Sequence, residues 1–145
     1  MGLCRIVYLS KATKPMSHRK LEALVERCSV RNHANGISGL LLHSGGNFIQ
    51  VLEGDSIRVP SLYTKICRDP RHTGIRTLVR QAAASRLFPD WGMQLANTGQ
   101  MKSVDHAAIN KILLRLRLAS DASAVAQSQA IALLQEFRRQ LMDAA

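Results

Sequence analysis

The order of hydrophobic patterns along the chain constrains its fold more than any other feature. Dense runs of β-forming residues occupy 3–10, 37–44, 47–54, 75–84 and 91–97. Apolar residues at helical spacing lie between the first and second of these runs, and again between the third and fourth. The pattern predicts an α+β protein with a ferredoxin-like βαββαβ order and a fifth strand.

Turn and capping residues support this order. Ser17 is suited to begin a helix that runs to about residue 34, and Asn35–Gly36 is typical of a helix end. Gly45–Gly46 predicts a hairpin, and Asp55 or Ser56 can cap the second helix. Right-handed crossovers place both helices on one face of the sheet. We therefore expect a slot between the two helices that suits a flat aromatic ligand.

The C-terminal part, residues 100–145, has two further apolar stripes at helical spacing. The first follows a possible cap at Ser103, and the second begins after the polar segment 120–123. Two short amphipathic helices are expected to cover the free face of the sheet as an extension of a domain at 1–99. They do not suffice for a catalytic domain, so we expect a non-enzyme whose output is a partner or an altered oligomer.

Charge and cysteine content narrow the classes of function. The net charge is +10, but the cations are scattered, which favours a solvated basic surface over a nucleic-acid stripe. Cys4, Cys28 and Cys67 lack the spacing of a disulfide framework or a zinc site. No apolar run approaches the length of a membrane span, and the start lacks a secretion signal. These features predict a cytoplasmic protein that binds neither a metal nor a membrane. They disfavour nucleic acid as a partner.

Two polar residues interrupt predicted strand faces that are otherwise apolar. Tyr8 shares a face with Ile6, and Gln50 shares a face with Phe48 and Leu52. A buried polar group needs a hydrogen-bonding partner. Tyr8 and Gln50 are therefore expected to bond either each other or a ligand.

Five stretches resemble the BLUF family, blue-light sensors that bind FAD noncovalently. They are RIVYLSKAT, VRNHANGISGLLL, GGNFIQVLEG, ICRDPRHTGI and FPDWGMQL. Each stretch is weak alone, but together they are distributed over nearly the whole length of residues 1–99 in the right order. The resemblance implies a bacterial photoreceptor, a flavoprotein of signal transduction that holds FAD between the two helices. It also implies a downstream effector protein in trans, either an enzyme or a transcription regulator, and a homo-oligomer.

The resemblance assigns roles to five residues. Tyr8 matches the tyrosine that gives an electron and then a proton to the photoexcited flavin. Gln50 matches the glutamine whose amide rearranges between that tyrosine and the ring, and Asn32 matches the asparagine that holds the ring edge. Trp91 and Met93 match the residues of the last strand that pass the change outward. A phenol suits coupled electron and proton transfer, and a primary amide can reverse its donor and acceptor without backbone motion.

Four further residues are expected to contact the cofactor. Arg71 and His72 resemble family positions near its phosphate-bearing tail, where a cation is expected. Leu24 is a pocket position on the first helix, and Arg31, next to Asn32, faces either ligand or solvent.

Other interpretations fit parts of the same sequence. Taken singly, Tyr8 is an ordinary core tyrosine and Met93 a packing residue. A ferredoxin-like nucleic-acid-binding module is the main alternative function, because Tyr8 and Phe48 are placed to stack bases, but it lacks the aromatic motif of such modules. An acylphosphatase-like hydrolase has Arg31 and Asn32 available, but not in a phosphate-cradling loop.

Overall fold

A computed structural model of the chain describes residues 2–89, 92–101, 104–118 and 123–143. It contains a five-stranded sheet of order β4-β1-β3-β2-β5, in which β5 is parallel to β2 and the other pairs are antiparallel. The described elements are β1 (Leu3–Ala12), α1 (His18–Ala34), β2 (Ser38–Ser44), β3 (Asn47–Asp55), α2 (Arg58–Cys67), β4 (His72–Ala83), β5 (Gln94–Asn97), a 3-10 turn (Thr98–Gln100), α3 (His106–Leu118) and α4 (Ala124–Asp143). The predicted ferredoxin-like order with a fifth strand is confirmed.

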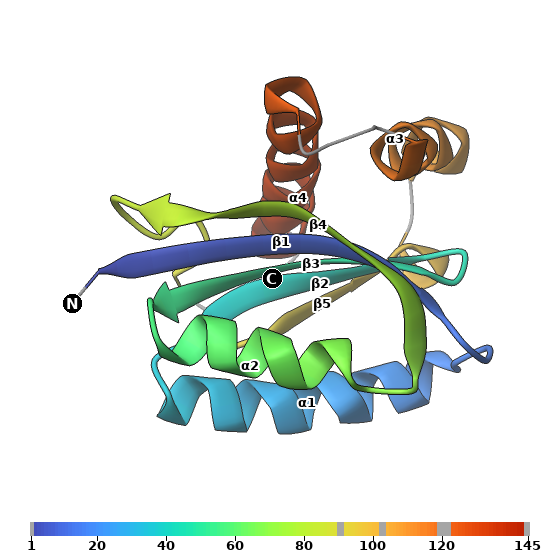
Figure 1. Cartoon of the computed structure of the whole chain (residues 1–145). Helices are drawn as coiled ribbons and strands as arrows, with labels where there is room; N and C mark the ends of the chain where they lie inside the picture. Colours follow the sequence, from blue (N-terminus) through green and yellow to red (C-terminus); the bar gives the residue numbers. More distant parts are fainter. Residues whose placement is uncertain (1, 90–91, 102–103, 119–122, 144–145) are drawn as a thin grey trace.

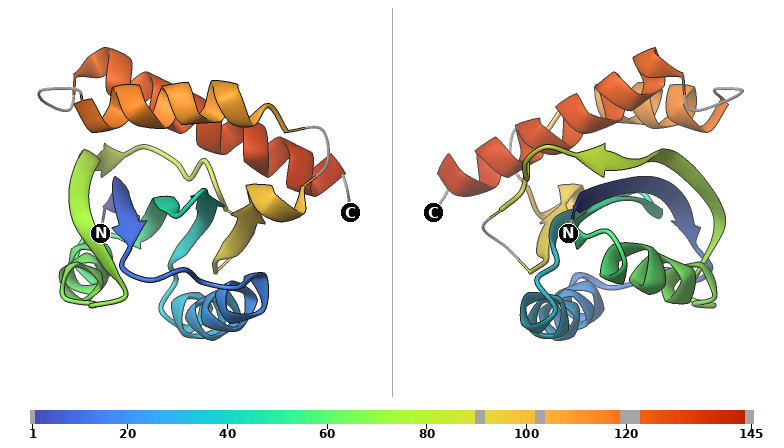
Figure 2. Two further views of the ribbon diagram at one scale, coloured as in Figure 1. Left: turned by 90° about the vertical axis from the view of Figure 1, so that its right-hand side faces the viewer. Right: turned by 60° about the vertical axis from the view of Figure 1, so that its left-hand side comes forward.

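The sheet lies between two helical layers, with α1 and α2 on one face and α3 and α4 on the other (Figures 1 and 2). Side chains of Leu21 and Val59 from the first layer meet Ile6 of β1 in one core. Leu134 and Phe137 of α4 belong to a second core on the opposite face. The alternation of side chains along each central strand feeds both cores, which is why these strands are buried throughout.

The helix starts follow local polar signals. Ser17 Oγ accepts a hydrogen bond from the Lys20 amide at 3.2 Å, as its position before α1 predicts. Asp55 Oδ1 accepts from the amides of Ile57 and Arg58 at 2.7 and 3.0 Å, so this carboxylate satisfies the first free N–H groups of α2. Ser17 is the N-cap of α1, as expected, whereas the N-cap of α2 is Ile57, whose side chain makes no capping bond, so Asp55 acts from two residues earlier than the cap.

The last two strands differ in extent from the sequence pattern. β4 begins at His72, three residues earlier than expected, whereas β5 begins only at Gln94. Gly92 explains the late start of β5, because the Asn32 side chain holds its carbonyl against α1. A Cβ at Gly92 would lie 2.3 Å from the Ser29 carbonyl oxygen, so only glycine permits this approach. Trp91, expected on the same strand, lies outside the described residues.

None of the helices in the described ranges combines the length and the apolar character that crossing a membrane requires.

Candidate functional site

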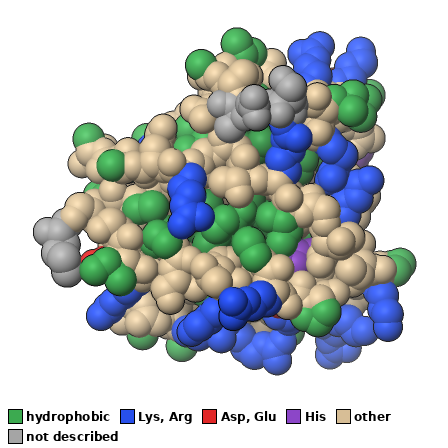
Figure 3. Space-filling model, in the orientation of Figure 1, with side chains coloured by type: hydrophobic (Ala, Val, Ile, Leu, Met, Phe, Trp, Pro, Cys, Tyr) green, Lys and Arg blue, Asp and Glu red, His purple; other side chains and the backbone are tan. Residues whose placement is uncertain are grey.

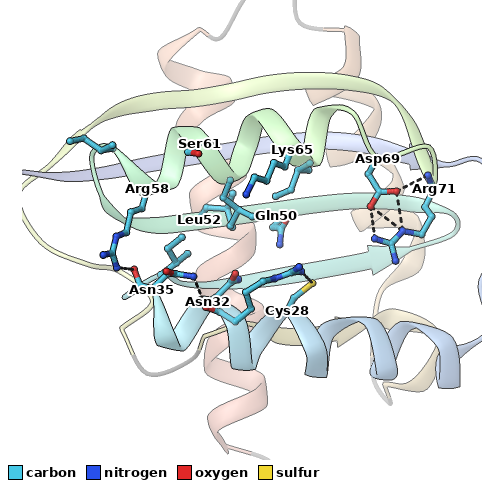
Figure 4. A pocket seen from close by; sticks show the side chains of 15 residues that line it. Cys28, Asn32, Asn35, Gln50, Leu52, Arg58, Ser61, Lys65, Asp69 and Arg71 are labelled. Carbon is cyan, nitrogen blue, oxygen red and sulfur yellow. Dashed lines mark hydrogen bonds and ion pairs between the residues drawn. The ribbon is translucent and has the colours of Figure 1, made fainter.

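A cleft of about 420 Å³ separates α1 from α2 over the centre of the sheet (Figure 4). Helix α1 supplies one wall and α2 the other, while Gln50 and Leu52 of β3 form part of the floor. The slot expected between two helices on one face of the sheet is therefore present. Its wall and rim residues are Cys28, Arg31, Asn32, Asn35, Ile37, Ile57, Arg58, Ser61, Leu62, Lys65, Ile66, Asp69 and Arg71.

A smaller inner compartment of about 100 Å³ continues this cleft toward β1. The two share residues from both walls and the floor, among them Cys28, Gln50 and Ile66. The inner part is mostly apolar and is lined in addition by Tyr8, Met16, Leu24, Val25, Leu41, Phe48, His72 and Met93. The site therefore has an apolar interior with few polar groups and a wider, basic mouth.

Three buried side chains form a hydrogen-bonded chain along the floor. Tyr8 and Gln50 are opposite each other in the β1–β3 register. The Tyr8 hydroxyl donates to Gln50 Oε1, and Gln50 Nε2 donates to Met93 Sδ at 3.3 Å. The amide oxygen thus faces the phenol and the amide nitrogen faces the thioether. This arrangement links the centre of the sheet to the residue that precedes β5.

The surroundings of Tyr8 keep its phenol protonated. Burial raises the pKa of Tyr8 above its ordinary value, and the nearby Tyr63 adds to the rise. The Tyr63 ring centroid lies 5.3 Å from that of Tyr8 with the planes tilted by 41°. A neutral phenol can donate its proton to the Gln50 amide oxygen, as the hydrogen bond requires.

His72 lies beside Tyr8 and lines the inner compartment. Its ring meets the Tyr8 ring edge-on, with centroids 6.1 Å apart. Nδ1 is 2.8 Å from Ser10 Oγ, and Nε2 is 2.6 Å from the Ile66 carbonyl oxygen. Because a carbonyl oxygen only accepts, Nε2 carries a hydrogen. Both ring nitrogens are therefore engaged by the protein.

The other residues singled out from the sequence border the same space. Asn32 is buried and donates through Nδ2 to the Gly92 carbonyl oxygen at 3.0 Å. Leu24 lines the inner compartment, while Arg31 is exposed at the rim with Nη2 3.7 Å from Cys28 Sγ. The structure thus brings together every site residue predicted from sequence except Trp91, which it does not describe.

Arg71 lines the cleft with its charge already paired. Its Nε donates to both carboxylate oxygens of Asp69, at 2.9 and 3.0 Å. The Arg71 hydrogen bond lowers the pKa of Asp69, and the Asp69 hydrogen bond raises the pKa of Arg71. Asp69 is the one carboxylate among the described residues that line the main cleft.

Two cations of α2 were missed by the sequence analysis. Arg58 and Lys65 are seven residues apart, about two helical turns, so both face the cleft (Figure 4). Arg58 Nη1 also donates to the Asn35 carbonyl oxygen at 3.3 Å across the cleft. The sequence signal for them is their seven-residue spacing, which together with Leu62 places all three on one face of the helix. The mouth therefore suits an anionic group, and the interior suits an aromatic ring.

Comparison with known proteins gives one consistent family. Residues 3–94 match the family model described as BLUF, sensors of blue-light using FAD. The chain is 39% identical over 95 residues to the photoactivated adenylate cyclase subunit beta of Euglena gracilis, covering 65% of this chain and 11% of that protein. It is 36% identical over 93 residues to the blue light- and temperature-regulated antirepressor BluF of Escherichia coli (strain K12), covering 64% and 23%. The chain spans about a tenth to a quarter of the length of these two relatives.

Solved structures give the same result. The structure titled BlrB, a BLUF protein in its dark state, matches with a TM-score of 0.72 and 26% identity, covering 94% of each chain. A bacterial light-regulated adenylyl cyclase matches with a TM-score of 0.71 and 31% identity, covering 79% of this chain and 34% of that one. The first likeness includes the C-terminal region, because it covers nearly the whole chain.

Proposed function

This chain belongs to the BLUF family of blue-light sensors that use FAD, and we propose that Tyr8 and Gln50 carry its photochemistry. As a member of that family it is a flavoprotein photoreceptor. The observation that supports the assignment of residues is the chain of hydrogen bonds from Tyr8 through Gln50 to Met93. It joins an oxidisable phenol, a reversible amide and the segment that enters β5.

The residues of the cleft fit FAD. The apolar inner compartment, with Tyr8 and Gln50 as its polar floor, is suited to a flat aromatic ring. Arg31, Arg58 and Lys65 at the mouth supply positive charge for a diphosphate. In this proposal Asn32 and Leu24 contact the ring. Arg71 and His72, which the resemblance places near the phosphate-bearing tail, line the inner compartment with Tyr8, so we assign them to the border of the ring instead. When bound, FAD supplies the absorption of blue light and an electron-accepting ring.

The protein's own part of the mechanism lies in the phenol and the amide. Tyr8 is the electron donor, and its hydroxyl proton is held toward Gln50 Oε1. Reversal of the Gln50 amide would turn its nitrogen toward Tyr8 and its oxygen toward Met93. A thioether has no hydrogen to donate, so the contact with Met93 Sδ would be lost. Met93, together with Trp91, would then pass the change to β5.

The output is proposed to lie outside this chain. Residues 1–99 would be the sensor domain and residues 100–145 an extension that contacts a cytoplasmic effector protein or a second copy of the chain. In support, Leu114 and Leu118 of α3 are 56% and 73% exposed, and α3 contains three cations and no carboxylate. Figure 3 shows Lys and Arg side chains gathered at this end of the molecule. On this proposal the chain is not itself an enzyme, although its relatives include an adenylate cyclase and an antirepressor.

The test is the visible absorption spectrum of the purified protein in darkness and just after blue light. We expect a flavin spectrum that shifts slightly to the red and returns in darkness. Gln50→Leu should retain the flavin and lose the shift, because leucine has no donor or acceptor to exchange. Gln81→Leu, an exposed position on β4, is the control and should shift normally. A normal shift in Gln50→Leu would contradict the proposed amide switch.

A further inference from the structure

A buried carboxylate on β3 lies outside the cleft. Glu53 is three residues from Gln50 and points to the opposite face of the sheet, with 1% of its surface exposed. Its Oε2 accepts from Arg5 Nε at 2.7 Å. The proposed photochemistry uses neither of these charged groups.

The same carboxylate holds the backbone of the connection between β4 and β5. Its oxygens accept from the Leu87 amide at 2.9 and 3.0 Å and from the Phe88 amide at 2.7 Å. Arg5 adds a bond from Nη2 to the Ser85 carbonyl oxygen at 2.9 Å. Charge-assisted bonds to backbone N–H groups are among the stronger hydrogen bonds in proteins.

Arg86 attaches this connection to β2 as well and adds a second bond to β3. Its Nη1 donates to Ser38 Oγ at 2.8 Å and to the Glu53 carbonyl oxygen at 3.2 Å, and its Nη2 donates to the Gly36 carbonyl oxygen at 2.6 Å. The ends of β1, β2 and β3 therefore share one attachment to residues 85–88. We call these contacts the Glu53 clamp: Arg5, Glu53 and Arg86 with the backbone of 85–88.

The clamped segment leads directly to the cleft. Phe88 is fully buried in the core beneath α3 and α4, while Met93 is buried in the core on the cleft side. At the Met93 end the contacts are weaker, namely a sulfur acceptor at 3.3 Å and one amide bond from Asn32 to Gly92. Phe88, next to the Glu53 carboxylate, and Met93, next to the Gln50 amide, thus lie in the cores on opposite faces of the sheet.

We propose that Glu53 is a positioning residue that directs a change at Met93 into β5. Because the clamp fixes residues 85–88, a displacement at Met93 cannot relax backward into the connection. It is passed instead to β5, whose Ala96 packs in the core shared with α3 and α4. This inference rests on the proposed function, in which the change at Gln50 begins the displacement.

The test is hydrogen exchange of the full chain with FAD bound, in darkness and under blue light, in the parent and in Glu53→Gln. The parent should show a light-induced increase in exchange over residues 92–97. In Glu53→Gln the red shift should remain, because Tyr8 and Gln50 are intact. The light-induced increase at 92–97 should fall by at least about threefold, and the Leu87 and Phe88 amides should exchange about tenfold faster in darkness, with or without FAD.

A second variant avoids an unpaired buried charge. Glu53→Gln leaves Arg5 without its partner and can unfold the protein, whereas Arg86→Met removes clamp bonds from a half-buried side chain and leaves the ion pair intact. Arg86→Met should likewise retain the red shift and lose most of the light-induced increase in hydrogen exchange at residues 92–97. Arg27→Met, which removes an exposed cation from α1, should behave as the parent.

The possible outcomes separate this inference from the proposed function. A parent without a red shift contradicts the proposed function. A parent that shifts in colour but shows no change at 92–97 overturns the clamp proposal. The clamp proposal is also overturned if a folded Glu53→Gln variant, or Arg86→Met, retains the full light-induced change, since the contacts to residues 85–88 would then be structural only.

Discussion

The Tyr8 hydroxyl and the Gln50 amide fix each other's orientation because β1 and β3 hold them directly opposite. Neither residue type is unusual in a strand. Burial excludes water as an alternative hydrogen-bonding partner, so the two side chains bond each other. The amide nitrogen then turns to Met93. At the scale of single residues, the pairing of this phenol with this amide is therefore a consequence of strand register.

The chain offers a matched test of the electron donor, since it has two tyrosines and both are buried. We expect Tyr8→Phe to retain flavin and lose the red shift, because phenylalanine has neither an oxidisable phenol nor a proton to give. Tyr63→Phe should retain the shift, because the Tyr63 hydroxyl bonds Thr77 Oγ1 at 2.6 Å and not the Gln50 amide. Light-minus-dark absorption of both variants checks this. Photocycling in Tyr8→Phe would assign the donor elsewhere.

Helix α2 differs from α1 in what it gives the site. α1 contributes the buried Asn32, whereas α2 contributes Arg58 and Lys65 with their charged ends at the mouth. The Asp69–Arg71 ion pair lies in the short connection between the end of α2 and the start of β4. At the scale of elements, the strands and both helices line the interior, while α2 supplies two of the cations at the mouth and α1 supplies Arg31.

The cations of α2 predict a dependence on the phosphates of the ligand. Lys65→Ala should weaken FAD binding about tenfold, the loss expected for one bond to a charged group, and the loss should shrink at high salt. Riboflavin, which has no phosphate, should bind the parent and the variant equally. Arg68→Ala, an exposed cation that does not line the cleft, is the control. Titration followed by flavin fluorescence measures both ligands with all three proteins, and equal FAD affinities of the parent and Lys65→Ala would exclude Lys65 as a phosphate partner.

The Asp69–Arg71 pair predicts a dependence on pH. The hydrogen bond from Arg71 lowers the pKa of Asp69, so the pair stabilises the fold fully above the ordinary Asp value of about 3.9. That contribution is lost as pH falls through the lower folded value. We therefore expect the difference in melting temperature between the parent and Asp69→Asn to be constant above about pH 5 and to vanish in stronger acid. A difference that grows on acidification would contradict the assigned direction.

The whole molecule has two cores that share one sheet. Side chains from alternate positions of the same strands face α1 and α2 on one side and α3 and α4 on the other. The C-terminal helices thus cover apolar surface that the sensor fold would otherwise expose. Because β5 contributes Leu95 to the core on the cleft side and Ala96 to the other core, this strand connects the cleft with the opposite face.

This division predicts that a mutation in the core beneath α3 and α4 lowers stability without changing the flavin spectrum. Phe137→Ala should lower the free energy of unfolding by about 3 kcal/mol, since the Phe137 side chain is 2% exposed on the face of α4 that packs on the sheet. The dark flavin spectrum should be unchanged, because none of the described cleft residues contacts that core. Gln135→Ala, exposed on the same helix, is the control. Denaturant unfolding and absorption measure the two effects, and a shifted dark spectrum in Phe137→Ala would show that the cores are not separate.

Much of the architecture was readable from local patterns. Caps such as Ser17 and Asp55 act on amides two or three residues away, and alternation along a strand predicts which side chains share a face. The sequence therefore determined the order of elements and the family resemblance. It placed β5 too early because the bond between Asn32 and Gly92 joins residues that are 60 positions apart.

What only the tertiary structure decided are the relations between distant segments. The orientation of the Gln50 amide depends on β1 and on Met93, and the roles of Arg58 and Lys65 depend on which helix lies across the cleft. Glu53 was read simply as part of a strand, yet its partners are Arg5 and the amides of Leu87 and Phe88. Periodicity reports which face a side chain takes, but a hydrogen bond across the fold depends on distances that arise only when the sheet assembles.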